Sequence, residues 1–461
     1  MVQFANRIQT DSGGMMRKWM IVSLFFGFTL SSWAQESEPS EFVVISKAPK
    51  QARVAIPVFR VRAQAEDAFQ LTEELSSLLV KDLEKSGLYS FIPRNSYLRM
   101  EPISEEIEDW QAWNLIGAQV LIRGELNELV PGQFRLTIKL FDIPSQKLAV
   151  GKNYSGPKAS LNRMIHRFAD EAILWLTDKR GPFEARIAFV SNRTGRKEIY
   201  FADTDGRNVF QLTNTKKLNL SPCWLSGNML YYTGYDQGNP DLYLLDLSGK
   251  KSLISSHPGL NISPAVGPGG KKIAMAMETP GNNLDIYIMN PDGTKPQRVT
   301  THPGADLEPT WSPDGYHIAF VSDRTGSPQI YWIDLSKGSE GEGNYPLRLT
   351  YYGNYNTSPA WSPDGRFIAY SRRIDNQFDL FLIDLKAEEG RSEIQLTNTP
   401  YNEEEPAWSP DSRMLVYSAN PAGNYDIFMI SIYKKEPIRI TDWSSDETQP
   451  SWSLNLFEEG G

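Results

Sequence analysis

From about residue 186 onward, short apolar runs and polar turns alternate in a pattern that repeats along the chain. A proline precedes a strand that usually carries tryptophan at Pro222, Pro264, Pro309, Pro359, Pro406 and Pro450, with spacings of 42, 45, 50, 47 and 44 residues. A period in this range with four short strands per unit is typical of β-propeller blades. The hydrophobic pattern therefore predicts a propeller over the second half of the chain.

Within each unit the same parts return in the same order. The first strand is followed by a Ser-Pro-Asp-Gly turn or a close variant, in which Asp and Gly supply the turn dihedrals. A second apolar strand comes next, then a third such as IYFAD from Ile199 or IYWID from Ile330. The fourth ends in Leu-Thr or a similar pair, as in QLT from Gln211. These strands are apolar on both faces, as expected when blades stack face to face.

The two ends of the repeat complete each other. The strand from Arg186 lacks a tryptophan strand ahead of it, whereas the strand around Gln449–Ser453 has no blade behind it. Pairing these two segments would close a ring without an exposed sheet edge. We therefore expect six blades over residues 186–453, closed by the C-terminal strand, with residues 454–461 as a tail.

Residues 53–180 show a mixed pattern of strands and helices. Apolar residues recur at three-to-four spacing over 66–87, which predicts an amphipathic helix that ends at Gly87. A second helix is expected over 105–116, a hairpin around Pro131-Gly132, and a third helix capped by Ser160. The fold class predicted for the whole chain is a small N-terminal α/β domain followed by a six-bladed β-propeller.

The first residues have the character of an export signal. Arg17 and Lys18 precede an apolar run over 19–30 and small residues up to Ala34. This pattern predicts a signal peptide over 1–34, with synthesis starting at Met15 or Met16. The alternative, a membrane anchor, is disfavoured because 12 apolar residues are too few to cross a bilayer. Residues 35–52 are then a flexible N-terminal segment, and no membrane insertion is expected.

Composition and charge exclude several functions. The chain has 47 basic and 56 acidic residues, a net charge of −9, which argues against a nucleic-acid partner. The single cysteine, Cys223, excludes an internal disulfide and a cysteine-rich metal site. Cys223 occupies the slot held by Ala360 and Ala407 in sister blades, so we interpret it as core packing.

The combination of an export signal, a small α/β domain and a propeller with repeated Pro-x-Trp-Ser-Pro-Asp-Gly, Ile-Tyr-x-x-Asp and Leu-Thr motifs resembles the TolB family of the periplasmic Tol-Pal system. The resemblance covers nearly all of the chain after Gln35 in the same order, including RVAIPVF from Arg53. It implies a monomeric periplasmic adaptor without cofactor or metal, which supports outer-membrane integrity and envelope constriction at cell division.

The resemblance also implies two partners. The first is the lipoprotein Pal, bound at the propeller mouth where the loops ahead of the repeated prolines converge. The positions expected there are Leu260, Asn261, Ser263, Asp306, Leu307, Glu308, Asn356, Thr357, Glu403, Glu404, Glu405 and Glu447. Their acidic members would form a rim suited to a basic partner or a cation. The second partner is TolA, bound through Phe42, Val43, Val44 and Ile45; the alternative for that patch is an edge strand of the first domain. Other outer-membrane proteins are further candidates.

The competing class is an enzyme, namely a propeller-type periplasmic hydrolase or the accessory domain of a peptidase. Peptidases with such propellers carry a Gly-x-Ser-x-Gly nucleophile motif, which this sequence lacks. A sialidase-like propeller would need an arginine cluster at the mouth, which the expected loops do not supply. Asp203 and Asp205 faintly resemble a calcium loop without its downstream Glu, and His257 and His302 have no second ligand at metal spacing. We expect no catalytic residues.

Overall fold

The computed structural model describes residues 51–62, 68–98, 108–341, 343–387, 392–434 and 436–453. All of these belong to one compact unit spanning residues 42–461. The expected signal peptide, most of the flexible segment, Phe42–Ile45 and the tail 454–461 lie outside the described residues. Among the described residues, no helix combines the length and the apolar character that a membrane crossing requires.

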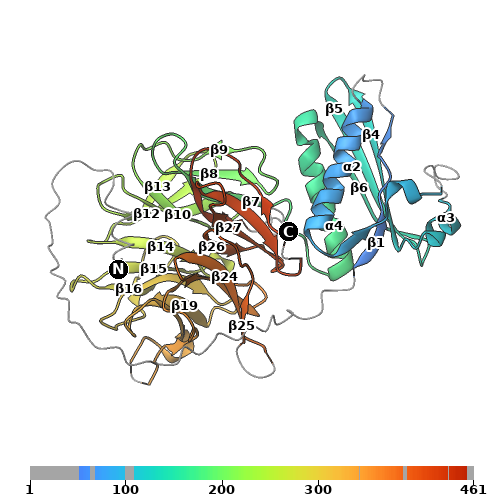
Figure 1. Cartoon of the computed structure of the whole chain (residues 1–461). Coiled ribbons are helices and arrows are strands. Elements are labelled where there is room, and N and C mark those ends of the chain that lie inside the picture. The colour runs from blue at the N-terminus through green and yellow to red at the C-terminus, as the bar shows by residue number, and fades with distance from the viewer. Residues whose placement is uncertain are drawn as a thin grey trace. The chain divides into compact units, whose positions relative to one another are not determined.

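The N-terminal α/β domain contains one sheet, with two long helices packed on one face and a short helix on the other (Figure 1). Its strands are β1 (Ala52–Ala55), β2 (Arg60–Val61), β3 (Tyr89–Phe91), β4 (Val120–Val130), β5 (Gln133–Asp142) and β6 (Lys147–Pro157). Its helices are α2 (Ala68–Lys85), α3 (Trp110–Leu115) and α4 (Leu161–Thr177). The strand order is β3-β1-β4-β5-β6, with β2 paired to β4; β1 is parallel to its neighbours, whereas β4, β5 and β6 are antiparallel.

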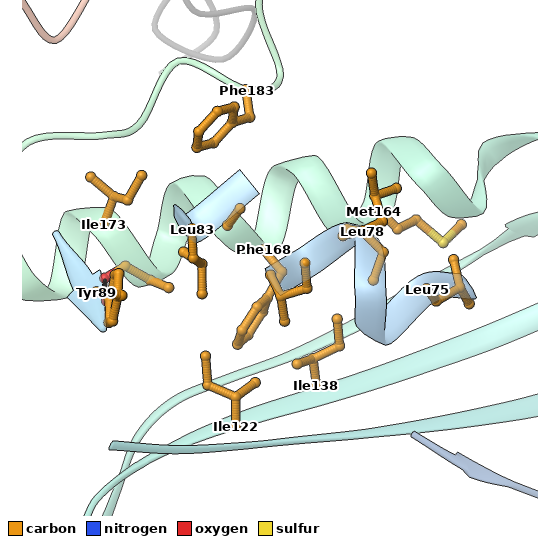
Figure 2. Packing of buried hydrophobic residues seen from close by; sticks show 14 of the residues in the cluster. Leu75, Leu78, Leu83, Tyr89, Ile122, Ile138, Met164, Phe168, Ile173 and Phe183 are labelled. Atoms are coloured by element: carbon orange, nitrogen blue, oxygen red, sulfur yellow. Dashed lines mark hydrogen bonds between the residues drawn. The ribbon is translucent and has the colours of Figure 1, made fainter. Parts of the chain in front are cut away.

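The core of this domain lies between the sheet and the two long helices. The apolar stripe of α2 buries Leu75, Leu79 and Leu83, as its spacing predicts. Figure 2 shows Phe168 of α4 directed toward Ile122 and Ile138 of the sheet. Because these side chains are almost completely removed from water, each stabilises the fold by roughly 1.5–3 kcal/mol.

Three local expectations are changed by the structure. Helix α3 begins at Trp110, later than the expected start at 105, although residues 101–107 lie outside the described part. Strand β6 was not expected from the sequence. Ser160 does not cap α4 through its side chain; its Oγ donates a hydrogen bond to Pro157 O instead, at 2.8 Å.

The second part is a six-bladed β-propeller, as the repeat predicts, and each blade is a four-stranded antiparallel sheet. The first blade consists of β30 (Glu447–Trp452), β7 (Arg186–Ser191), β8 (Glu198–Asp203) and β9 (Phe210–Gln211). The second contains β10 (Asn219–Trp224), β11 (Met229–Gly234), β12 (Asp241–Asp246) and β13 (Lys251–Ser255). The third contains β14 (Asn261–Val266), β15 (Ile273–Glu278), β16 (Leu284–Met289) and β17 (Gln297–Arg298).

The remaining blades follow the same plan (Figure 1). The fourth contains β18 (Asp306–Trp311), β19 (His317–Ser322), β20 (Gln329–Asp334) and β21 (Leu347–Arg348). The fifth contains β22 (Asn356–Trp361), β23 (Phe367–Ile374), β24 (Gln377–Asp384) and β25 (Ser392–Gln395). The sixth contains β26 (Glu403–Trp408), β27 (Met414–Ala419), β28 (Asp426–Ser431) and β29 (Ile438–Arg439).

The first blade is built from both ends of the propeller sequence. β30 pairs antiparallel with β7, with Glu447 opposite Ser191 and Trp452 opposite Ile187. Ser453 Oγ also accepts a hydrogen bond from the Arg186 N–H at 2.9 Å. The C-terminal strand therefore closes the ring, and its pairing removes the edge that β7 would otherwise expose.

The repeated sequence motifs have defined structural tasks. In the Leu-Thr pair, or its Ile-Thr variant, the threonine hydroxyl accepts a hydrogen bond from a backbone N–H of the third strand. Thr213 accepts from the N–H of Ile199 and Thr441 from that of Ile427, both at 2.8 Å. In the Ser-Pro-Asp-Gly turn, Ser362 Oγ accepts the N–H of Phe367 at 2.9 Å, which closes the turn onto the next strand. These motifs are thus blade-building devices.

Candidate functional site

The innermost strands of the propeller, β10, β14, β18, β22, β26 and β30, contact one another in a closed ring. Each has six residues, and each is interrupted by a shift of register between its second and fifth residues. A β-bulge of this kind redirects side chains that would otherwise alternate along the strand. The same irregularity therefore recurs six times around the central channel.

The third residue of each innermost strand lies in the left-handed region of backbone conformation. We call this set the inner ring: Ser221, Ser263, Glu308, Ser358, Glu405 and Gln449, with φ between 50° and 60°. None of these residues is glycine, so each conformation has an energetic cost of about 1–2 kcal/mol. Their side chains are half-buried. Three of them, Ser263, Glu308 and Glu405, belong to the mouth residues expected from the sequence.

Side chains of the inner ring tie neighbouring blades together. Gln449 Oε1 accepts the N–H of Ser221 at 2.9 Å, and Glu405 Oε2 accepts the N–H of Gln449 at 2.8 Å. Glu308 Oε2 accepts the N–H of Ser358 at 2.7 Å. Hydrogen bonds to a carboxylate are stronger than those between neutral groups. The inner ring is therefore a polar constriction that carries two carboxylates.

The first residue of every innermost strand is buried, which corrects the expectation of an exposed acidic rim. Asp306, Glu403 and Glu447 are all 0% exposed, and so are the asparagines Asn219, Asn261 and Asn356 at the equivalent positions. Asp306 pairs with Arg324 at 3.1 Å, and Glu447 Oε1 accepts the hydroxyl hydrogen of Ser191 at 2.7 Å. Burial raises the pKa of Asp306 to about 6, although Arg324 lowers it. Because these side chains are removed from solvent, they are not available to a partner.

Leu307, Thr357 and Glu404 occupy the second position of their strands, and Leu260 directly precedes β14. Leu307 is half-buried against the cores of two blades, and Thr357 is buried. Glu404 Oε2 accepts the hydroxyl hydrogen of Tyr425 at 2.6 Å, and the N–H of Leu260 donates to Glu278 at 3.0 Å. Of the acidic positions expected at the mouth, only Glu308, Glu404 and Glu405 are partly accessible.

The tryptophans of the repeat pack between blades and do not form a binding cage. Trp224 Nε1 donates to Ser451 O at 3.1 Å, Trp311 Nε1 to Ala265 O at 3.1 Å, and Trp408 Nε1 to Ala360 O at 2.9 Å. Each of these bonds reaches back to the preceding blade.

The other polar candidates have local structural partners. Burial raises the pKa of the partly buried Cys223 thiol to about 11, so the thiolate is disfavoured. His302 Nδ1 accepts the N–H of Gly304 at 2.9 Å, and Asp205 contacts His166. Within the part of the chain that the structure describes, no group of three acidic, His or Cys residues could hold a metal ion.

Sequence reasoning missed the counterion of Asp306. Arg324 lies between Asp306 and Glu340, at 3.1 and 2.7 Å, and its guanidinium also bonds Ser322 Oγ at 2.9 Å. The available signal was the Ser-Asp-Arg run that begins at the last residue of β19. A buried aspartate at the start of an innermost strand needs such a counterion.

The fold and its polar ring define a six-bladed β-propeller protein with an N-terminal α/β domain. Comparisons with known proteins agree: the model of the TolB β-propeller domain matches residues 174–456, and that of the TolB amino-terminal domain matches residues 41–149. The chain belongs to the TolB family. A relative in this family is named as a protein of the Tol-Pal system.

Individual relatives and a solved structure show the extent of the similarity. The Tol-Pal system protein TolB of Desulfosudis oleivorans is 34% identical over 53% of this chain and 57% of its own length. The TolB homolog of Chlorobium luteolum is 32% identical over 68% of this chain and 71% of its own length. The chain thus matches little more than half of the first relative. The crystal structure of TolB from Acinetobacter baumannii matches 88% of this chain and 98% of its own, with 26% identity and a TM-score of 0.73.

Proposed function

We propose that this chain is an exported adaptor that binds Pal over the inner ring and TolA through its N-terminal segment. Such an adaptor would support outer-membrane integrity and envelope constriction at cell division. The observation that supports the Pal site is the inner ring itself, where six non-glycine residues with a positive φ lie on adjoining strands around the channel. Strained backbone conformations tend to be retained where they serve function.

The chemistry of the ring favours a partner that brings donors or a positive charge. Glu308 and Glu405 place two carboxylates in the ring, and Glu404 adds a third at the next position of β26. No positively charged side chain belongs to the inner ring itself. A basic or hydrogen-bond-donating loop of Pal would therefore meet complementary groups there.

The Pal site is tested by substituting serines of the inner ring with a larger residue while leaving Glu308 and Glu405 unchanged. We expect Ser263→Arg and Ser221→Arg to lower the affinity for purified Pal by at least about tenfold, because each adds bulk and a positive charge where a donor-bearing loop would enter. Ser252→Arg, on the outer strand β13, makes the same chemical change away from the channel. Calorimetric titration gives the affinities, and thermal unfolding confirms that the propeller is intact. Unchanged affinity in both ring variants would place Pal elsewhere.

The TolA site is tested by deletion of residues 35–45. A short β-prone segment can add to a partner's sheet edge, taking affinity from backbone hydrogen bonds. We expect the deletion to abolish TolA binding while Pal binding is retained or strengthened. Both affinities are measured on the same preparation, and retained TolA binding would exclude this segment as the contact.

A further inference from the structure

The outer edge of β6 in the α/β domain has no strand beside it. β6 is the last strand in the order β3-β1-β4-β5-β6, and no other strand among the described residues pairs with its outer edge. With eleven residues it is as long as β4, and no strand among the described residues is longer. A strand in this position presents a row of N–H and C=O groups that can template another strand.

A groove runs along this edge between β6 and α4. It has a volume of about 540 Å³ and is lined by residues 153–157 of β6 and by Arg163, Met164 and Arg167 of α4. The hydroxyl of Tyr154 is buried in this region and has no hydrogen-bond partner. The volume lies within the range of ligand-binding pockets, and five consecutive residues at the C-terminal end of β6 line it.

The groove is basic in a chain that is acidic. Arg163 and Arg167 lie 3.8 and 3.9 Å from the buried carboxylate of Glu184. The two guanidinium groups bring two positive charges to the single carboxylate that they share, so these three side chains leave a net positive charge at the groove. Residues 133–180, which comprise β5, β6 and α4, contain nine Lys and Arg against four Asp and Glu, whereas the whole chain has a net charge of −9. This concentration of charge favours an anionic ligand.

We propose that this groove binds an extended, acidic segment of a partner protein, which adds as a strand to the outer edge of β6. Backbone groups of the segment would pair with β6, and its acidic side chains on the helix-facing side would reach Arg163 and Arg167. The site uses neither the inner ring nor residues 35–45, so it is independent of the Pal and TolA sites proposed above.

The test uses two synthetic heptapeptides and the full-length protein. In the first peptide, acetylated and amidated, glutamate alternates with valine or threonine; in the second, lysine replaces each glutamate. We expect the glutamate peptide to bind in calorimetric titration at least about tenfold more tightly than the lysine peptide, because like charges repel at the groove. Equal affinities, or no binding by either peptide at millimolar concentration, would overturn the proposal.

Strand addition is tested by methylating the peptide's amide nitrogens. In a strand, successive N–H groups point to opposite edges, so only alternate amides of the peptide can pair with β6. Methylation of one alternate set should abolish binding, whereas methylation of the other set should change the affinity by less than about twofold. Equal loss from both sets would contradict strand addition. This measurement uses the unmodified protein and therefore does not depend on any variant folding.

The basic residues are tested by charge reversal with a matched control. The double variant Arg163→Glu with Arg167→Glu should lower the affinity for the glutamate peptide at least about tenfold. Lys271→Glu with Lys295→Glu, two exposed positions of the propeller, changes the net charge equally and should leave the affinity unchanged. If both double variants lowered the affinity equally, the binding would depend on the overall charge of the protein and not on the groove, which would overturn the proposal.

Two other occupants give distinct results. If the chain's own acidic segment covers the edge, the glutamate peptide will bind only after deletion of residues 35–45. If the surface binds anionic lipid, vesicles of phosphatidylglycerol will bind the protein while the peptides do not. Either result would overturn the assignment to a partner's extended segment.

Discussion

A buried histidine links the α/β domain to the first propeller blade and allows a sharp prediction. His166 of α4 is 2% exposed; its Nδ1 lies 2.6 Å from Asp82 Oδ2 of α2, and its Nε2 lies 3.3 Å from Asp205 Oδ2 in the loop after β8. Burial alone would lower its pKa, but the two carboxylates raise the pKa of His166 to about 10. The imidazolium therefore lies between two buried carboxylates and makes the shorter contact with each, since Lys85 is 3.7 Å from Asp82 and Arg207 is 3.6 Å from Asp205.

The perturbation is His166→Gln, which keeps a similar size and removes the charge. A pKa raised from about 6.5 to about 10 corresponds to at most about 5 kcal/mol of stability, at about 1.4 kcal/mol per unit. Removal of one partner from a buried ion pair costs about 3–5 kcal/mol by comparison with other proteins. We therefore expect the variant to lose about 3–5 kcal/mol at pH 7.

The pH dependence follows from the direction of the shift. Because the folded-state pKa is the higher one, the stabilisation is fully present below pH 6.5 and is lost as the pH rises toward about 10. The other charges facing this site are Lys85 of α2, Asp170 of α4 and Arg207 beside Asp205. Comparison of variant and native protein at each pH cancels their own titrations to first order.

The assay is urea unfolding followed by tryptophan fluorescence at pH 6, 7, 8.5 and 10.5. The difference between native protein and His166→Gln should be largest at pH 6 and should shrink at pH 10.5. His257→Gln, in an exposed loop, should differ from the native protein by less than about 0.5 kcal/mol throughout. A loss below about 1 kcal/mol at pH 7, or a loss that is constant with pH, would refute the ion-triad reasoning.

Three further predictions concern the propeller. Truncation that removes β30 (Glu447–Trp452) should open the first blade and cause aggregation or a large fall in Tm; a soluble truncation with native Tm would disprove closure by this strand. Burial raises the pKa of Glu403 to about 7, so ionisation of this side chain destabilises the folded protein. Glu403→Gln should therefore stabilise the protein by up to about 3 kcal/mol above pH 7, but not at pH 4.5. An equal effect at both pH values in urea unfolding would contradict this prediction. A Cβ added at Gly206 (φ 80°) would lie 2.1 Å from Ile440 O, whereas one added at Gly195 (φ 89°) would meet open space. Gly206→Ala should therefore lower the free energy of unfolding by several kcal/mol, and Gly195→Ala by about 1–2 kcal/mol. Equal losses in the same assay would show that the contact with Ile440 is relieved.

The sequence predicts the architecture well because the repeat is carried by residues with local tasks. Thr213 accepts the N–H of Ile199, 14 residues away, and Ser362 accepts that of Phe367, five residues away, so the motifs act within one blade and their spacing places the strands. Closure of the ring was also predictable, because the repeat has one unmatched strand at each end and these two strands can complete a blade only by pairing with each other. Strand β6 was missed because its sequence, KLAVGKNYSGP, contains two glycines and few apolar residues.

The burial of the acidic positions could not be predicted from the sequence. Glu403, Glu404 and Glu405 are consecutive and chemically alike, yet the first is fully buried and the other two are half-buried. The bulge interrupts the alternation of side chains between the two faces of the strand. Counting odd and even positions in the sequence therefore does not tell which side chain faces the channel. The partners that allow an acidic side chain to be buried are also distant in the sequence. Asp306 is paired with Arg324, which follows the next strand along the chain.

The identity of the inner-ring residues carries a further consequence. Glycine adopts a positive φ without cost, yet none of the six positions is glycine, so the side chain itself must be used. At Glu308, Glu405 and Gln449 the use is visible, because each side chain accepts the N–H of the next blade's ring residue. Ser221 and Ser263 carry side chains too short to span that distance, although they share the same backbone conformation. The arc that they form is therefore where a partner's side chain would find both room and polar groups, which is why the Pal experiment substitutes these serines and leaves the glutamates intact.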